Sequence, residues 1–331
     1  MECSSYGEYH KGSLEMKRYV EIVLLAGIVA LLTGCVIGHD RSSGEAVELS
    51  LRAVVSHRTR SAEDTDHGFS TTFPTDTDFG MWAFSLPRDR KWEVFRPDAE
   101  PLATNAKCSY GASDGLWHPE QKVAWHYPEA LTLIAYAPYD LAARLDTRQG
   151  LVIEEFDMSE RGEVDILYTD YLADRLMEEN TLGVNMPFYH ALAKVDIKAQ
   201  CVLPKGYEIV VHKIAVEGVA TRGTFTSHPE PEWIAEGALS EVVLYQSDEG
   251  WDLTANNGAY VEEADGLFVP QSQHLTLRIE TELTSGGFAA PRVFRTPLLN
   301  VVWEAGKYYT YSLYFSNDEV RVEEPQKQNF D

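Results

Sequence analysis

The stretch from Leu31 to Arg60 reads LLTGCVIGHDRSSGEAVELSLRAVVSHRTR, and its middle part indicates the fold class of the chain. Apolar residues at 47, 49 and 51 alternate there with polar residues at 48, 50 and 52, and Ala53 continues the apolar series. Because successive side chains of a strand point to opposite faces, this alternation is typical of a half-buried β-strand. We therefore predict a strand from Val47 to Val55, with Val47, Leu49 and Leu51 on its buried face.

The residues before this strand have the order of an export leader. Lys17 and Arg18 follow Met16, and the apolar run from Ile22 to Leu32 has the length of a signal peptide, too short for a membrane span. Leu32-Thr33-Gly34-Cys35 then fits a bacterial lipobox, whose cysteine receives the lipid. We predict that residues 1–35 are an extension plus a lipoprotein signal peptide, that Cys35 carries palmitate, and that residues 36–46 are a flexible tether. The alternative is an ordinary secretory leader with a chance cysteine.

Two arginines, Arg58 and Arg60, follow the predicted strand. They lie at the start of a segment, from His57 to Thr77, that is rich in Ser, Thr, Asp and Arg and is predicted to form a loop. An exposed polar loop is a preferred place for proteolysis. A cut after Arg60, or after Arg58, would separate the strand from the rest of the chain, so we predict that the strand is removable.

Composition and charge restrict the function further. The 331 residues are 44% apolar, which is enough for a packed core, and their formal net charge of −24 leaves no basic stripe to contact nucleic acid. Of the four cysteines, Cys108 and Cys201 are the two that fall in the predicted folded part, and the sequence leaves open whether they pair. We expect no cofactor and no metal.

The remainder of the chain consists of short strands between turn signals. This pattern predicts an all-β fold of two sandwich domains, at residues 47–180 and 184–331. A helical pattern with Leu172 and Leu176 four residues apart predicts one short helix from Tyr171 to Glu179, next to the domain boundary. The strands that we predict span residues 79–84, 131–136, 166–168, 187–200, 207–217, 241–245, 274–283 and 307–315.

Three motifs suggest chemistry but have simpler explanations. Gly111-Ala112-Ser113-Asp114-Gly115 matches the nucleophile elbow of a hydrolase, but Pro119 follows too soon for the helix that an elbow needs, so a β-turn is expected. The carboxylates at 64, 66, 76 and 78 alternate without the late bidentate Glu of a calcium loop, and a solvated acidic loop is expected. His190 has no second ligand at metal spacing and is expected to be hydrogen-bonded in the structure.

The tryptophans suggest a second function. An exposed indole can stack on a sugar ring, and Trp117 and Trp125 lie in the region richest in loop signals, so these two are candidate glycan contacts. Most of the seven tryptophans are expected in the core, because aromatic side chains dominate core packing.

Several segments together indicate a family. They occur in the order LLTGC, SHRTRSAE, TDFGMWAFS, WHYPEALTLIAYAP, GEVDILYTDYL, MPFYHALAKVDIKA, YEIVVHKIAVEGVATRGTFT, LFVPQSQHLTLRIETEL and VVWEAGKYYTYSLYF. In this order they resemble the fimbrillin (Mfa-like) family of Bacteroidetes surface proteins, the subunits of type V pili. The resemblance covers nearly the whole mature chain.

The resemblance implies a fold, an assembly mechanism and a location. It implies two tandem transthyretin-like β-sandwich domains and export as a lipoprotein of the outer membrane. It also implies cleavage after an arginine beyond the first strand, which leaves a groove that a strand of the next subunit fills. Such a protein is a pilus subunit or a tip or accessory adhesin and not an enzyme. After Phe315 only a short acidic tail remains, which leaves both stalk and tip roles open. A surface lipoprotein that binds glycans and does not polymerise is the alternative.

Overall fold

The structure is a computed structural model that describes residues 44–56, 71–92, 99, 101–162, 164–169, 172–180, 182–254, 261–299 and 301–330. Strands make up 64% of the described residues and helices 3%. This composition confirms the predicted all-β fold class. Residues Gly44–Asp331 group by their contacts into one compact unit. The predicted division of this unit into two transthyretin-like domains stays a prediction.

The described strands form four sheets, and the largest contains β2, which covers residues 51–55 of the predicted N-terminal strand. Its hydrogen-bonded order is β11-β13-β2-β6-β5-β4-β8-β12, with β3 paired to β2 and a further pairing between β11 and β8. Most of the buried apolar side chains of these strands share one hydrophobic cluster, whereas Trp82, Ile134, Tyr136 and Tyr168 belong to a second one. The strands are β2 (Leu51–Val55), β3 (Thr71–Thr72), β4 (Phe79–Leu86), β5 (Pro101–Gly111), β6 (Leu116–Pro119), β8 (Ala130–Ala137), β11 (Leu167–Tyr168), β12 (Leu172–Arg175) and β13 (Val184–His190). A small separate sheet pairs β1 (Ala46–Glu48) with β7 (Ala124–His126).

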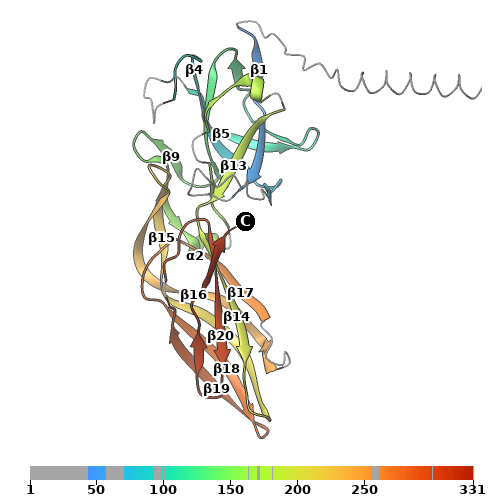
Figure 1. The fold of residues 1–331 in the computed structure, drawn as a ribbon, viewed down its shortest axis with the longest axis vertical. Coiled ribbons are helices and arrows are strands. Elements are labelled where there is room, and N and C mark those ends of the chain that lie inside the picture. Colours follow the sequence, from blue (N-terminus) through green and yellow to red (C-terminus); the bar gives the residue numbers. More distant parts are fainter. Residues whose placement is uncertain are drawn as a thin grey trace, which may run out of the picture. The chain divides into compact units, whose positions relative to one another are not determined.

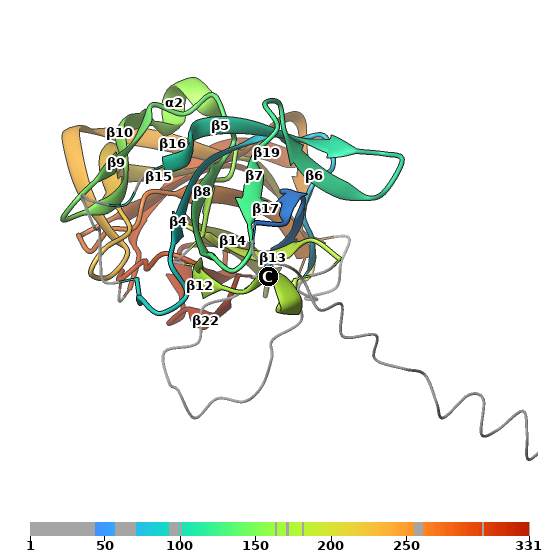
Figure 2. The same cartoon turned by 90° about the horizontal axis from the view of Figure 1, so that it is seen from above.

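Two further sheets contribute buried side chains to a second hydrophobic cluster. The six-stranded sheet has the order β19-β18-β15-β10-β9, with β16 along β15, and the five-stranded sheet has the order β17-β14-β20-β21, with β22 on β20. Figure 1 shows β14 beside β20, which pair in parallel, and Figure 2 shows β9 and β10 grouped with β15 and β16. The strands are β9 (Ala143–Asp146), β10 (Gly150–Asp157), β14 (Ala193–Cys201), β15 (Tyr207–Thr226), β16 (Glu232–Asp252), β17 (Val261–Phe268), β18 (Thr276–Ser285), β19 (Phe288–Pro297), β20 (Lys307–Phe315), β21 (Val320–Val322) and β22 (Gln326–Asn329).

The predicted helix from Tyr171 to Glu179 is wrong over most of its length. Residues Leu172–Arg175 form β12, in which Leu172 lies opposite Leu133 of β8, and only Met177–Glu179 form a 3₁₀ turn, η1. The spacing of Leu172 and Leu176 therefore did not mark a helix face, because pairing with β8 determines the backbone here. The longest described helix is α2 (Met158–Arg161), which Asp157 caps by accepting the N–H of Ser159.

The predicted strand over residues 187–200 is two strands. β13 ends at His190 and β14 begins at Ala193, and the two belong to different sheets. The acidic tail that follows Phe315 pairs with its own chain, since β21 and β22 both lie antiparallel to β20.

The segment that matched a hydrolase elbow is a turn, as expected. Residues 112–115 connect β5 to β6, and the backbone N–H groups of Asp114 and Gly115 donate to the carbonyl of Gly111 at 3.3 and 2.9 Å. The Asp114 side chain accepts from the N–H of Leu116 at 3.2 Å, which helps to fix the turn.

Candidate functional site

The candidate site is built around β2, which is paired with other strands of the largest sheet on both of its sides. Residues Leu51–Val55 run parallel to Val184–Phe188 of β13. On the other side, Val54 and Val55 face Thr72 and Thr71 of β3, and Leu51 faces Trp117 of β6. At the two ends, Val184 N–H donates to Ser50 O at 2.9 Å and Ser56 N–H donates to Phe188 O at 2.8 Å. Removing β2 would thus leave the backbone groups of β13 unpaired along one edge.

The side chains of this stretch alternate as a half-buried strand requires, from Leu49 onward. Leu49, Leu51, Ala53 and Val55 are each at most 5% exposed and belong to the same hydrophobic cluster, whereas Arg52 is exposed. Val47 is separate, because it lies on β1 and is 36% exposed. The structure therefore brings Leu49 and Leu51 together, as predicted, and places Val47 elsewhere.

Aromatic rings form much of the cluster that β2 covers. Phe73 lies 4.7 Å from Phe188 and 5.5 Å from Trp117, measured between ring centroids, and Phe79 lies 5.2 Å from Phe188. All four rings are at most 3% exposed. Loss of β2 would expose part of this aromatic cluster to water, which is a large apolar penalty.

The expectation that Trp117 and Trp125 lie on the surface is wrong. Both indoles are 3% exposed. Trp117 packs against Phe73 and Tyr110, and the Trp125 Nε1–H donates to the carbonyl of Glu129 at 2.9 Å. The turn residues around them suggested a loop, but β6 and β7 carry the two rings into the core, where their area is most favourable. Buried rings cannot stack on a sugar.

The predicted lipid and cleavage residues, Cys35, Arg58 and Arg60, lie outside the described residues. The two ends of the segment that contains both arginines are described, however. β2 ends at Val55, just before Ser56, and β3 begins at Thr71, and these strands are paired with each other. Residues 57–70 are therefore the covalent link between two adjacent strands, and a cut there would leave β2 joined to β3 through non-covalent contacts alone.

The two cysteines of the folded part do not pair. Cys108 and Cys201 are both free thiols with buried side chains. Burial raises the pKa of the Cys108 thiol, and the carboxylates of Asp78 and Glu120 raise it further. Burial also raises the pKa of Cys201, with a smaller effect of Asp252. Both groups are held as unreactive thiols at neutral pH.

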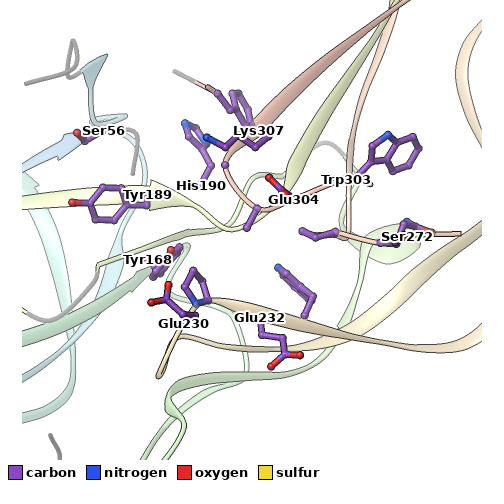
Figure 3. A pocket seen from close by; sticks show the side chains of 17 residues that line it. Ser56, Tyr168, Tyr189, His190, Glu230, Glu232, Ser272, Trp303, Glu304 and Lys307 are labelled. Atoms are coloured by element: carbon purple, nitrogen blue, oxygen red, sulfur yellow. The ribbon is translucent and has the colours of Figure 1, made fainter. Parts of the chain in front are cut away.

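A cavity of about 660 Å³ lies at the end of β2. Ser56, Tyr189, His190, Trp233, Glu304 and Lys307 are among the residues that line it (Figure 3). The His190 side chain is 8% exposed, and its Nδ1 is hydrogen-bonded to a carboxylate oxygen of Asp165. Its ring stacks on Phe330, with 3.8 Å between centroids and 14° between planes. His190 thus has the hydrogen-bonded structural role expected from the sequence, and it also forms part of a cavity wall.

Neither a metal centre nor a membrane helix is found in the described part of the chain. No group of three His, Cys, Asp or Glu side chains there is arranged to hold a metal ion. Among the same residues, no helix has the length and apolar character that a membrane span requires.

Comparison with known proteins gives a consistent result. Residues 60–326 match the model of the Fimbrillin-like family, so the matched region begins beyond β2. A fimbrial protein from Bacteroides vulgatus has a similar fold, with a TM-score of 0.56 at 14% identity over 86% of this chain and 100% of that one. A proposed cell adhesion protein from Bacteroides ovatus gives a TM-score of 0.54 at 13% identity over 88% and 99%. None of the curated proteins compared matches the chain. Because the family model matches most of its length, the chain belongs to the Fimbrillin-like family.

Proposed function

We propose that the protein is a cell-surface fimbrial subunit, or an accessory or tip adhesin of a fimbria, that assembles by strand exchange. Family membership and the two fimbrial and adhesion neighbours support the general role. The position of β2 supports the mechanism, and it is the observation that carries the proposal. β2 completes the hydrophobic cluster of its sheet, yet its connection to the remainder of the sheet is the arginine-containing segment 57–70.

The proposed sequence of events has three steps. The chain is exported as a lipoprotein and held in the outer membrane by the lipid on Cys35. An Arg-specific protease then cuts after Arg60, or after Arg58. The fragment that contains β1 and β2 leaves, and a strand of another pilus subunit enters the vacated place beside β13.

The free energy of side-chain burial favours the entry of a new strand over an empty place beside β13. Leu49, Leu51 and Val55 are almost fully buried, and a buried aliphatic side chain contributes about 1.5–3 kcal/mol. The three together amount to several kcal/mol on this scale, which is comparable to the whole stability of many domains. A cut subunit should therefore either accept a strand or lose stability.

A gel of unboiled, protease-treated protein tests the proposal. The cut protein is expected to give a ladder of oligomers, and the Arg58→Ala, Arg60→Ala double variant is expected to stay full-length and monomeric. A single band from the cut protein would favour a surface lipoprotein that does not polymerise. A ladder from the double variant would mean that strand removal is not the switch.

Trp117 and Trp125 do not support the glycan-binding alternative. The two indoles on which it depended are buried. The stalk and tip roles are both compatible with the proposal.

A further inference from the structure

The N-terminal fragment contacts β7 as well as the largest sheet. Residues 46–48 of β1 lie opposite residues 124–126 of β7 in antiparallel register, and the Leu49 N–H continues this pairing by donating to Val123 O at 2.9 Å. Among the described residues, β7 pairs with no strand other than β1. Loss of the fragment would therefore leave the backbone groups of β7 without a partner, in addition to one edge of β13.

The place that residues 44–56 occupy, which we call the acceptor site, is continuous from β7 to β13. Trp125 of β7 is 3% exposed and belongs to the same hydrophobic cluster as Leu51 of β2. Leu49, which lies between β1 and β2, is 2% exposed and belongs to this cluster too. A strand that filled only the part beside β13 would leave the part beside β7 open to water.

An ion pair marks the β7 part of the acceptor site. The Lys122 Nζ lies 2.7 Å from a carboxylate oxygen of Glu48, and both side chains are exposed. Lys122 comes two residues before Ala124, which is the register partner of Glu48. Cleavage would remove Glu48 with the fragment and leave Lys122 behind, so a carboxylate at the same position of a new strand would restore the pair.

This ion pair distinguishes between registers that the apolar side chains alone would accept. A shift of the strand by one residue turns its apolar face to water, but a shift by two residues keeps the alternation. A shift by two would bring Ala46 or Ser50, both uncharged, to the position of Glu48. An exposed ion pair contributes little to affinity, and its effect is therefore to favour one register over these alternatives.

We propose that the acceptor site includes β7, and that Lys122 selects an incoming strand of another pilus subunit that carries a carboxylate at the position of Glu48. The inference rests on the strand exchange proposed above, and it names the chemistry of the strand that is accepted. Such a strand has apolar residues at the positions of Leu49, Leu51 and Val55, with an acidic residue immediately before the first of them.

Peptide binding to the cut, full chain tests the inference. A site-specific protease sequence is inserted between Arg60 and Thr71, the protein is cut there, and labelled peptides are added in excess to displace the N-terminal fragment. The peptides are residues 44–56, the same peptide with Glu48→Lys, and a shorter peptide of residues 49–56. Fluorescence anisotropy gives their relative affinities, because all three compete with the same fragment. We expect the shorter peptide to bind at least about fivefold more weakly than residues 44–56, since it leaves β7 unpaired.

Two protein variants of equal net charge test the role of Lys122. Lys122→Glu places a carboxylate beside the position of Glu48, and Lys205→Glu makes the same change at an exposed lysine in the turn before β15. For each variant, the affinity of residues 44–56 is divided by the affinity of the Glu48→Lys peptide. We expect this ratio to be about three- to tenfold lower in Lys122→Glu than in Lys205→Glu, because the first variant repels the acidic peptide and attracts the basic one.

The outcomes distinguish the inference from the proposed function. If the ratio is the same in the two variants, Lys122 does not select the strand, and if the shorter peptide binds as tightly as residues 44–56, β7 is not part of the acceptor site. Strand exchange stands in both cases, but the inference is overturned. If no peptide displaces the fragment, strand exchange fails, and the inference fails with it.

Discussion

At the scale of single residues, Leu51 carries the clearest energetic prediction. Its side chain is fully buried in the cluster that β2 completes, whereas its neighbour Arg52 is exposed. Leu51→Ala should lower the free energy of unfolding of the intact protein by about 2–5 kcal/mol, through lost burial and the cavity that remains. Arg52→Ala is the control and should change it by less than about 0.5 kcal/mol. Urea unfolding measures both, and equal effects would show that Leu51 does not face the core.

A second residue-scale prediction concerns pH. The hydrogen bond from Lys213 is the main cause of the lowered pKa of Glu241; burial acts in the opposite direction, and the charges of Lys213 and Arg278 add to the lowering. A carboxyl whose pKa is lowered on folding stabilises the protein above its unfolded pKa, near 4.3, and that contribution is lost as pH falls through the folded value. Lys213→Met should therefore destabilise the protein slightly at pH 7, by less than about 1 kcal/mol.

The stability difference between Lys213→Met and the parent protein, measured again at acid pH, tests the ion pair between Lys213 and Glu241 most directly. The difference between Lys213→Met and the parent protein should shrink towards zero as pH falls through the lowered pKa of Glu241, where this carboxylate becomes protonated. Lys205→Met, at an exposed lysine in the turn before β15, provides the matched control. A difference that stays unchanged down to the most acidic pH at which the parent protein remains folded would mean that packing of the lysine stem, and not its charge, accounts for the effect.

At the scale of elements, the sequence predicted strands well where the alternation was regular. The strand predicted for residues 307–315 has the bounds of β20, and Leu49 to Val55 bury every second side chain as the pattern required. The sequence pattern does not predict β5 or β19 as strands. Most residues of β19 are exposed, and its partner β18 supplies the pairing that defines it. Edge strands of this kind lack the apolar pattern from which strands are predicted.

The errors in the candidate site have a similar cause. Val47 continues the alternation of Leu49 and Leu51, but the chain passes from β1 to β2 between Glu48 and Leu51, and β1 pairs with β7 instead. The loop signals around Trp117 and Trp125 favour exposed positions, but each residue lies on a short strand. Local residues could not show which distant strands would cover these side chains.

At the scale of the whole molecule, the proposed lipid on Cys35 would determine where the protein is held. Cys35→Ser should abolish incorporation of labelled palmitate and leave the leader uncut or the protein released from the membrane fraction. Several acyl chains hold a protein firmly where one is marginal, so the shift between fractions should be nearly complete. Substitution of Cys108 by Ser is the matched control, because that thiol is buried in the folded part. Equal palmitate incorporation in the two variants would contradict the assignment.

The proposed assembly connects these three scales, because it requires β2 to leave one subunit before another strand can replace it. The most direct measurement is the intact mass of the subunits recovered from the protease-generated ladder after denaturation. We predict subunits that begin at Ser61, or at Thr59 if Arg58 is used, with the fragment that contains Leu49 and Leu51 absent from the assembled fraction. Assembled subunits that still contain this fragment, whether uncut or bound as a cleaved peptide, would contradict assembly by strand exchange.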